Sequence, residues 1–118
     1  MDEVTFEIGT RATAAITNPT WETLELRRTI SRTRVEVAAL PLAPQEFERV
    51  NRWLNAASQE AAAEKPDRYE VGEHLAAAAH MLTEAGALVG AGTGVVQSLR
   101  RAVVLLGPAG LATLATVL

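Results

Sequence analysis

Acidic residues stop well before the end of this chain, and that asymmetry limits what it can fold into. The last of its 14 Asp and Glu residues is Glu84, and beyond it only Arg100 and Arg101 carry a charge. A segment so poor in charge has to be buried in a core, covered by a partner or placed in lipid. Any fold for this chain must therefore provide cover for residues 85–118.

The composition fits one globular domain and excludes several classes of function. Hydrophobic residues make up 48% of the 118 residues and charged residues 21%, which is typical of a folded protein. The absence of cysteine excludes disulfides and cysteine-ligated zinc. A net charge of −3 argues against a nucleic-acid partner. The acidic start lacks a secretory signal, so we expect a cytoplasmic protein, and the preference for arginine over lysine suggests a bacterial or phage origin.

Apolar and polar residues alternate through much of the first forty residues. Val4, Phe6 and Ile8 alternate with charged and threonine residues, and Leu24 and Leu26 do the same further on. This period of two indicates strands with one solvated face. We expect three or four strands of an antiparallel meander, near 4–8, 12–16, 24–30 and 35–37.

A helix is the competing interpretation for residues 18–34. Asn18 followed by Pro19 would suit an N-cap and a first helical position. Leu24 and Leu26 lie two residues apart, which fits a pleated strand better than a helical stripe. We therefore predict a strand here.

Two amphipathic helices are predicted after Pro44. The first stripe recurs at steps of three and four and comprises Phe47, Val50, Leu54, Ala57 and Ala61. The second has the same spacing and comprises Val71, Leu75, Ala78, Leu82, Ala85 and Val89. A short loop containing Pro66 joins them, so residues 44–89 are expected to form an antiparallel helical hairpin.

The remaining residues, 95–118, are expected to form one or two apolar helices. Val95, Val96, Leu99, Val103 and Leu106 give a further helical stripe, which Gly107-Pro108 ends or kinks. The predicted fold is thus α+β in a single domain, residues 1–118. It has a β-rich part at 1–40, a helical hairpin at 44–89 and an apolar helical tail at 95–118.

Gly86, Gly90 and Gly94 recur every four residues, which would place them on one face of a helix. Such a face permits close helix packing. The alternative is a glycine-rich break between two helices, which the additional Gly92 favours. A dinucleotide-binding loop is a poor match because a helix is predicted before these glycines where a strand is needed.

Metal, cofactor and phosphate sites have weak support. Glu73, His80 and Glu84 share one face of the second predicted helix, but no other ligand cluster completes a metal site. We predict neither metal nor cofactor. A basic run, comprising Arg27, Arg28, Arg32 and Arg34, could contact phosphate or an acidic partner, although a charged sheet edge is the simpler explanation.

The sequence predicts a non-catalytic interaction module. Neither the few serines nor the two histidines show a nucleophile–base pairing, so an enzyme is not expected. The apolar C-terminal region would dock on a protein partner or on a second copy of the chain. The candidate partner-binding residues are Trp53, Leu99, Val103, Leu106, Leu111 and Leu114.

A membrane is the alternative environment for residues 86–118. Ala102–Leu118 is uncharged but would span only about 25 Å as a helix, against a hydrocarbon thickness of about 30 Å. Extending the segment toward residue 86 places Arg100 and Arg101 inside the span. A short C-terminal anchor is the form of this alternative that the sequence permits.

Overall fold

The computed structural model describes residues 19–89 and 93–118, and these residues are helical without a strand. The elements are α2 (Trp21–Ala38), α3 (Pro44–Ala61), α4 (Arg68–Glu84), α5 (Thr93–Leu106), α6 (Pro108–Ala112) and the 3₁₀ turn η1 (Leu114–Thr116). The α+β prediction is therefore wrong for the described residues, which form an all-α fold. The strands expected near 4–8 and 12–16 lie outside the described residues.

The strands predicted at 24–30 and 35–37 are replaced by the single helix α2. Its N-cap is Thr20, whose hydroxyl accepts a hydrogen bond from the Thr23 N–H at 3.2 Å. The helical alternative was thus the correct one, although the helix starts three residues after Asn18. Its buried face has steps of three and four and comprises Thr23, Leu26, Ile30, Thr33 and Val37.

Threonines occupy core positions of α2, which is why its helical period was hard to recognise. The hydroxyl of Thr29 donates to the Glu25 carbonyl at 2.8 Å, and that of Thr33 donates to the Thr29 carbonyl at the same distance. These bonds to the preceding turn satisfy both buried hydroxyls, so the threonine methyl groups can pack in the core. Threonines that suggested the solvated face of a sheet therefore lie on the buried face of a helix.

The predicted helical hairpin is present as α3 and α4. Val50, Leu54 and Ala57 are buried on α3, as the stripe predicts. Asp67 caps α4 by accepting from the N–H groups of Tyr69 and Glu70. The second helix ends at Glu84, five residues before the predicted end. Gly86 follows in a turn at φ +70°, a conformation that glycine adopts without strain.

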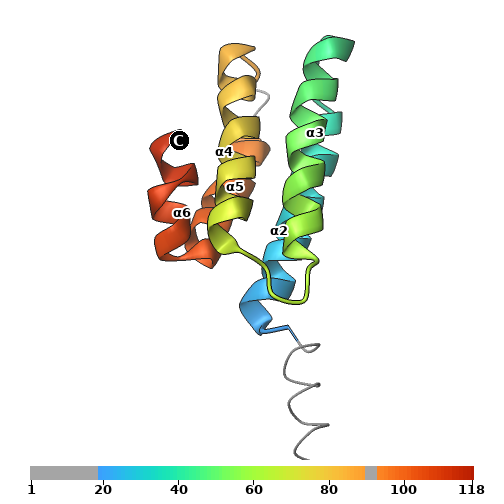
Figure 1. Ribbon diagram of the computed structural model, residues 1–118. Helices are drawn as coiled ribbons and strands as arrows, with labels where there is room; N and C mark the ends of the chain where they lie inside the picture. The colour runs from blue at the N-terminus through green and yellow to red at the C-terminus, as the bar shows by residue number, and fades with distance from the viewer. Residues whose placement is uncertain (1–18, 90–92) are drawn as a thin grey trace, which may run out of the picture.

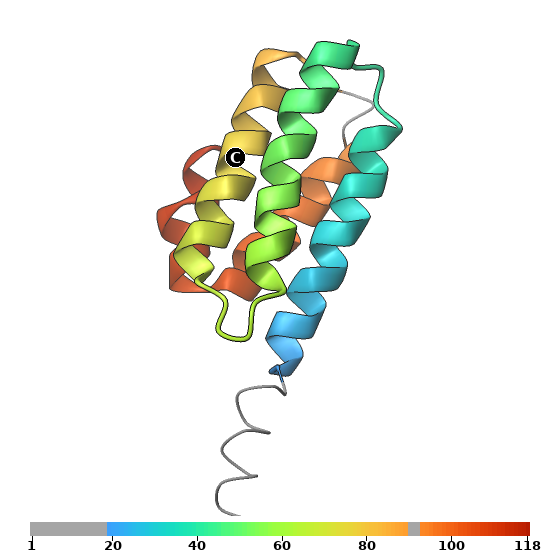
Figure 2. The same ribbon diagram turned by 45° about the vertical axis from the view of Figure 1, so that its right-hand side comes forward.

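The four longer helices alternate in direction and surround one core (Figures 1 and 2). The α3–α4 hairpin packs on one side, α2 and α5 lie against each other on the other, and α2 also contacts α3. Each helix contributes a stripe of small or branched apolar residues to the interior. This arrangement is an up-down-up-down bundle, which needs only short connections.

The chain reverses direction after α5. Gly107 adopts φ +65°, and Pro108 then starts α6, so α5 cannot continue. The segment formed by α6 and η1 packs along α4 and α5. Gly72 on α4 makes this approach possible, because a Cβ atom there would overlap the Thr113 hydroxyl. Leu114 is fully buried at the end of this segment.

The apolar C-terminal region does not form one long helix. The apolar region after residue 86 is divided between the 14-residue α5 and the five-residue α6. Across residues 19–89 and 93–118, no helix has both the length and the apolar character required to cross a bilayer.

Candidate partner-binding surface

Half of the residues predicted to bind a partner are in the core of the single chain. Leu99, Leu106 and Leu114 are each at most 1% exposed, and all three belong to the main hydrophobic cluster. Helices of the same molecule supply the cover that was expected from a partner. These three leucines hold the bundle together, and a partner could reach them only if the bundle opened.

The other predicted positions differ in exposure. Val103 is half-buried against the core, whereas Leu111 on α6 is 66% exposed. Trp53 is also half-buried, and its ring stacks on that of His74 with centroids 5.6 Å apart. This contact joins α3 to α4, so Trp53 already has an intramolecular role. Of the predicted set, Leu111 is the most accessible side chain.

The predicted glycine stripe is not on one helix. Gly86 lies in the turn after α4, Gly94 lies in α5, and Gly90 is outside the described residues. Gly94 faces α2, where a Cβ atom would come within 3.2 Å of the Glu36 carboxylate. The same carboxylate accepts the buried Ser98 hydroxyl at 2.7 Å. These small residues therefore allow Glu36 to approach α5 closely.

The outward face of α2 carries large apolar side chains that sequence reasoning did not identify. Trp21 is 62% exposed, Leu24 is 41% exposed and Val35 is 72% exposed. Together with Arg28 and Ser31 they recur at steps of three and four. At 100° per residue this stripe lies opposite the buried face of α2. We call these five residues the outer stripe.

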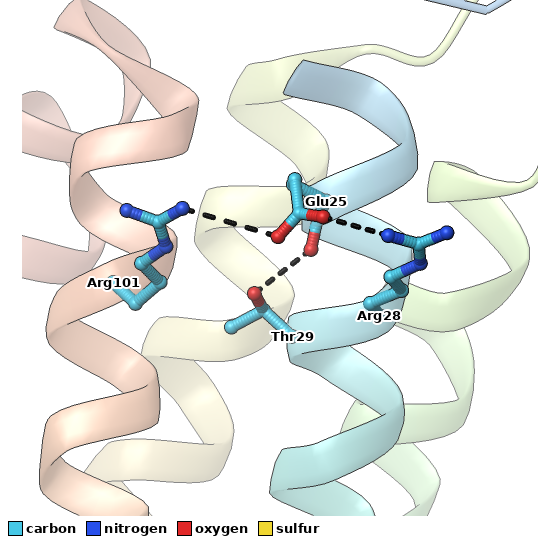
Figure 3. A network of polar contacts seen from close by, with 4 residues as sticks. All are labelled: Glu25, Arg28, Thr29 and Arg101. Carbon is cyan, nitrogen blue, oxygen red and sulfur yellow. Dashed lines mark hydrogen bonds and ion pairs between the residues drawn. The ribbon is translucent and has the colours of Figure 1, made fainter. Parts of the chain in front are cut away.

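Charged residues fix the outer stripe relative to α5 (Figure 3). The Glu25 carboxylate pairs with the Arg28 guanidinium at 2.9 Å and with that of Arg101, on α5, at 3.9 Å. The Arg101 guanidinium also lies 6.0 Å from the centroid of the Trp21 ring. These contacts orient the indole ring while leaving most of it accessible to solvent.

A shallow groove continues the outer stripe at the C-terminal end of α2. It has a volume of about 480 Å³. Its walls come from α2 and α3 and comprise Ser31, Arg34, Val35, Ala38, Phe47 and Asn51. The half-buried Phe47 ring and the exposed Val35 side chain make its lining partly apolar, and Arg34 places a positive charge beside it.

The basic run predicted from the sequence is divided by the helix rather than placed on a sheet edge. Arg28 and Arg32 are exposed on the outward side of α2. Arg27 turns toward α3, where its Nε donates to the Ala61 carbonyl at 2.6 Å and its Nη2 to the Ala63 carbonyl at 3.3 Å. Arg27 therefore caps the end of α3, and the outward arginines remain available to a partner.

The acidic residues and histidine considered as metal ligands remain on the surface of α4. His80 lies 3.5 Å from Glu84, and both side chains are largely exposed. Across the two described ranges, no three His, Asp or Glu side chains are grouped closely enough to hold a metal ion. The geometry of these residues is that of solvated side chains on a helix.

The two halves of the bundle carry opposite net charges. Helices α2 and α5 together contain six arginines and three glutamates, giving +3, whereas residues 44–84 contain four basic and eight acidic residues, giving −4. The outer stripe thus lies on the basic half.

Comparisons with protein-family models, with curated proteins and with solved structures give no match for this chain.

Proposed function

We propose that this chain is a non-catalytic protein-interaction module that binds its partner through the outer stripe of α2. One observation carries the proposal: three large apolar side chains are exposed along one face of a single helix that is already packed in a bundle. Single exposed apolar residues are common on protein surfaces, but three on the same face of one helix can contact one partner at the same time.

The chemistry of this face resembles that of protein interfaces. Tryptophan and arginine are the residues most enriched at binding hot spots, and Trp21 and Arg28 both belong to the stripe. Contact with Arg101 already restricts the Trp21 ring, so less side-chain freedom is lost on binding. Full burial of an exposed side chain of this kind contributes about 1.5 to 3 kcal/mol before the costs of association. Val35, which is 72% exposed, can gain most of this, and Leu24, which is 41% exposed, less than half.

The C-terminal region adds a smaller accessible surface. Val104 on α5 and Leu111 on α6 are 71% and 66% exposed. In this proposal the C-terminal helices mainly close the core, and these two side chains are exposed apolar positions outside the outer stripe. The absence of catalysis, a cytoplasmic location and a protein as the partner remain predictions that belong to this proposal.

Site-specific photo-crosslinking tests the proposal. A benzophenone amino acid is placed at Val35, and in a matched protein at Asn55, which is exposed on the neighbouring α3. We expect discrete crosslinked products from position 35 in cells of the source organism, and none from position 55. Adding the substitution Leu24→Glu to the protein that carries benzophenone at position 35 should abolish these products.

Equal crosslinking from both positions, or persistence of the products after Leu24→Glu, would contradict the proposal. Circular dichroism of each variant verifies that the bundle is intact. A failure to crosslink therefore cannot be attributed to unfolding.

A further inference from the structure

We infer that the occupant of the outer stripe is an acidic amphipathic helix of a partner protein. This inference rests on the proposed function and specifies the class of its partner. It follows from the spacing of the apolar side chains, the charges between them and the groove at one end.

Spacing defines the shape of the occupant. Leu24 and Val35 are 11 residues apart, which on a helix corresponds to about 16 Å. A straight helix lying along α2 can contact both with apolar residues at i, i+4, i+7 and i+11. The groove beside Val35 and Phe47 then receives the last of these side chains.

Charge defines its chemistry. Arg28 belongs to the stripe, Arg32 is exposed one helical turn further along and to one side of it, and Arg34 borders the groove. Glu25 is already paired with both Arg28 and Arg101, so a partner carboxylate would face a guanidinium along most of the stripe. Carboxylates flanking the apolar positions of the partner helix would complement these arginines.

A second copy of this chain fits the stripe less well. Antiparallel pairing of two α2 helices would bring Arg28 and Arg32 of both copies to the centre of the interface. Like charges that meet at an interface oppose association. A phosphate backbone would satisfy the arginines but would leave Trp21, Leu24 and Val35 without apolar contacts.

Two designed peptides of about 18 residues provide the test. Both are alanine-based helices with leucine at i, i+4, i+7 and i+11. One carries glutamate at the flanking positions, and the other carries lysine there. Binding of each fluorescently labelled peptide to the full chain is measured by anisotropy at low and high ionic strength.

The charge-reversal variant R28E/R32E is compared with R49E/R52E, which makes the same change in net charge at exposed positions of α3. We expect the glutamate peptide to bind the unmodified chain and R49E/R52E alike. It should bind R28E/R32E about tenfold more weakly, and that variant should prefer the lysine peptide. The difference should shrink as salt is added. R28Q/R32Q replaces the reversal if R28E/R32E does not fold.

Several results would overturn the inference. These are equal binding of the two peptides, equal losses in the two reversal variants, or no peptide binding while Val35 still forms crosslinks. Concentration-dependent dimers in light scattering that disappear with Val35→Glu would assign the stripe to a second copy. If no peptide binds while Val35 still forms crosslinks, or if the stripe binds a second copy, the proposed function stands. Absence of crosslinks at Val35 would remove the proposed function itself.

Discussion

Helices α2 and α3 have the same length, 18 residues, and lie side by side, yet their outer surfaces differ. Both bury an apolar stripe at steps of three and four. On the outward side, α3 presents polar residues such as Glu48, Asn55 and Gln59, whereas α2 presents Trp21, Leu24 and Val35.

The difference separates packing in the bundle from binding of a partner, two roles that one helix can combine. An inward apolar stripe is enough to place a helix in a bundle, as α3 shows. The exposed apolar side chains of the outer stripe add little to the packing of the isolated chain. The outward side chains of α2 are therefore the feature that folding of this chain does not explain, and for this reason the proposed function is assigned to them.

The largest effects are expected where the two helices are alike. Ile30 on α2 and Leu54 on α3 are both buried, so Ile30→Ala and Leu54→Ala should each lower the free energy of unfolding by about 2 to 5 kcal/mol. Urea denaturation followed by circular dichroism measures both. A loss below about 1 kcal/mol for Ile30→Ala alone would show that α2 is not integral to the core.

The next largest loss of unfolding free energy is expected at the contact between α2 and α3. Arg27 of α2 donates to two carbonyls at the end of α3, so Arg27→Ala should cost about 1 to 3 kcal/mol of unfolding free energy. Arg28→Ala is the matched control, since it loses only an exposed pair with Glu25, worth about 0 to 1 kcal/mol. Similar losses in the two variants would argue against the capping role of Arg27.

The N-cap residues of α2 and α3 differ, and substitutions can remove the side-chain cap from one helix or add it to the other. Thr20 caps α2, whereas Ala43 provides no side-chain cap to α3, where only the Glu46 carboxylate accepts from the Ala43 N–H at 3.0 Å. Thr20→Ala should lower the free energy of unfolding by about 1 kcal/mol, and Ala43→Ser should raise it by about 0.5 to 1 kcal/mol by completing the capping box. Thermal unfolding of both variants distinguishes these opposite signs.

The smallest change in stability is expected on the outer faces. Val35→Glu and Asn55→Glu should each alter the free energy of unfolding by less than about 0.5 kcal/mol. If Val35→Glu destabilised the isolated chain strongly, the Val35 side chain would have a structural role. The proposed assignment of this position to a partner would then be weakened.

The same comparison explains which parts of the fold the sequence could predict. In α3 the apolar residues occupy one face, so their period of 3.6 is visible, and the buried Val50, Leu54 and Ala57 were all identified. In α2 the inward Leu26 and the outward Leu24 belong to different stripes, and together they imitate the alternation of a strand. Because Thr29 and Thr33 fill core positions, they strengthened that wrong interpretation.

The candidate surface was harder to predict than the core. Leu99, Leu106 and Leu114 were assigned to a partner because a pattern of apolar residues does not reveal how far the same chain can cover them. Gly107 and Gly72 decide this, since one reverses the chain and the other admits the returning segment. The signal that could have revealed the outer stripe was the placement of Trp21, Leu24 and Val35 on one helical face. The steps of three and four continue between Leu24 and Val35 through Arg28 and Ser31.

The returning segment has a consequence for synthesis of the protein. The α4 surface around Gly72 remains uncovered until residues as far as Leu114 have left the ribosome, because those residues cover it. The nascent helices before this point can pair but cannot seal their shared interior. Completion of the native bundle therefore has to wait until the segment formed by α6 and η1 has been synthesised.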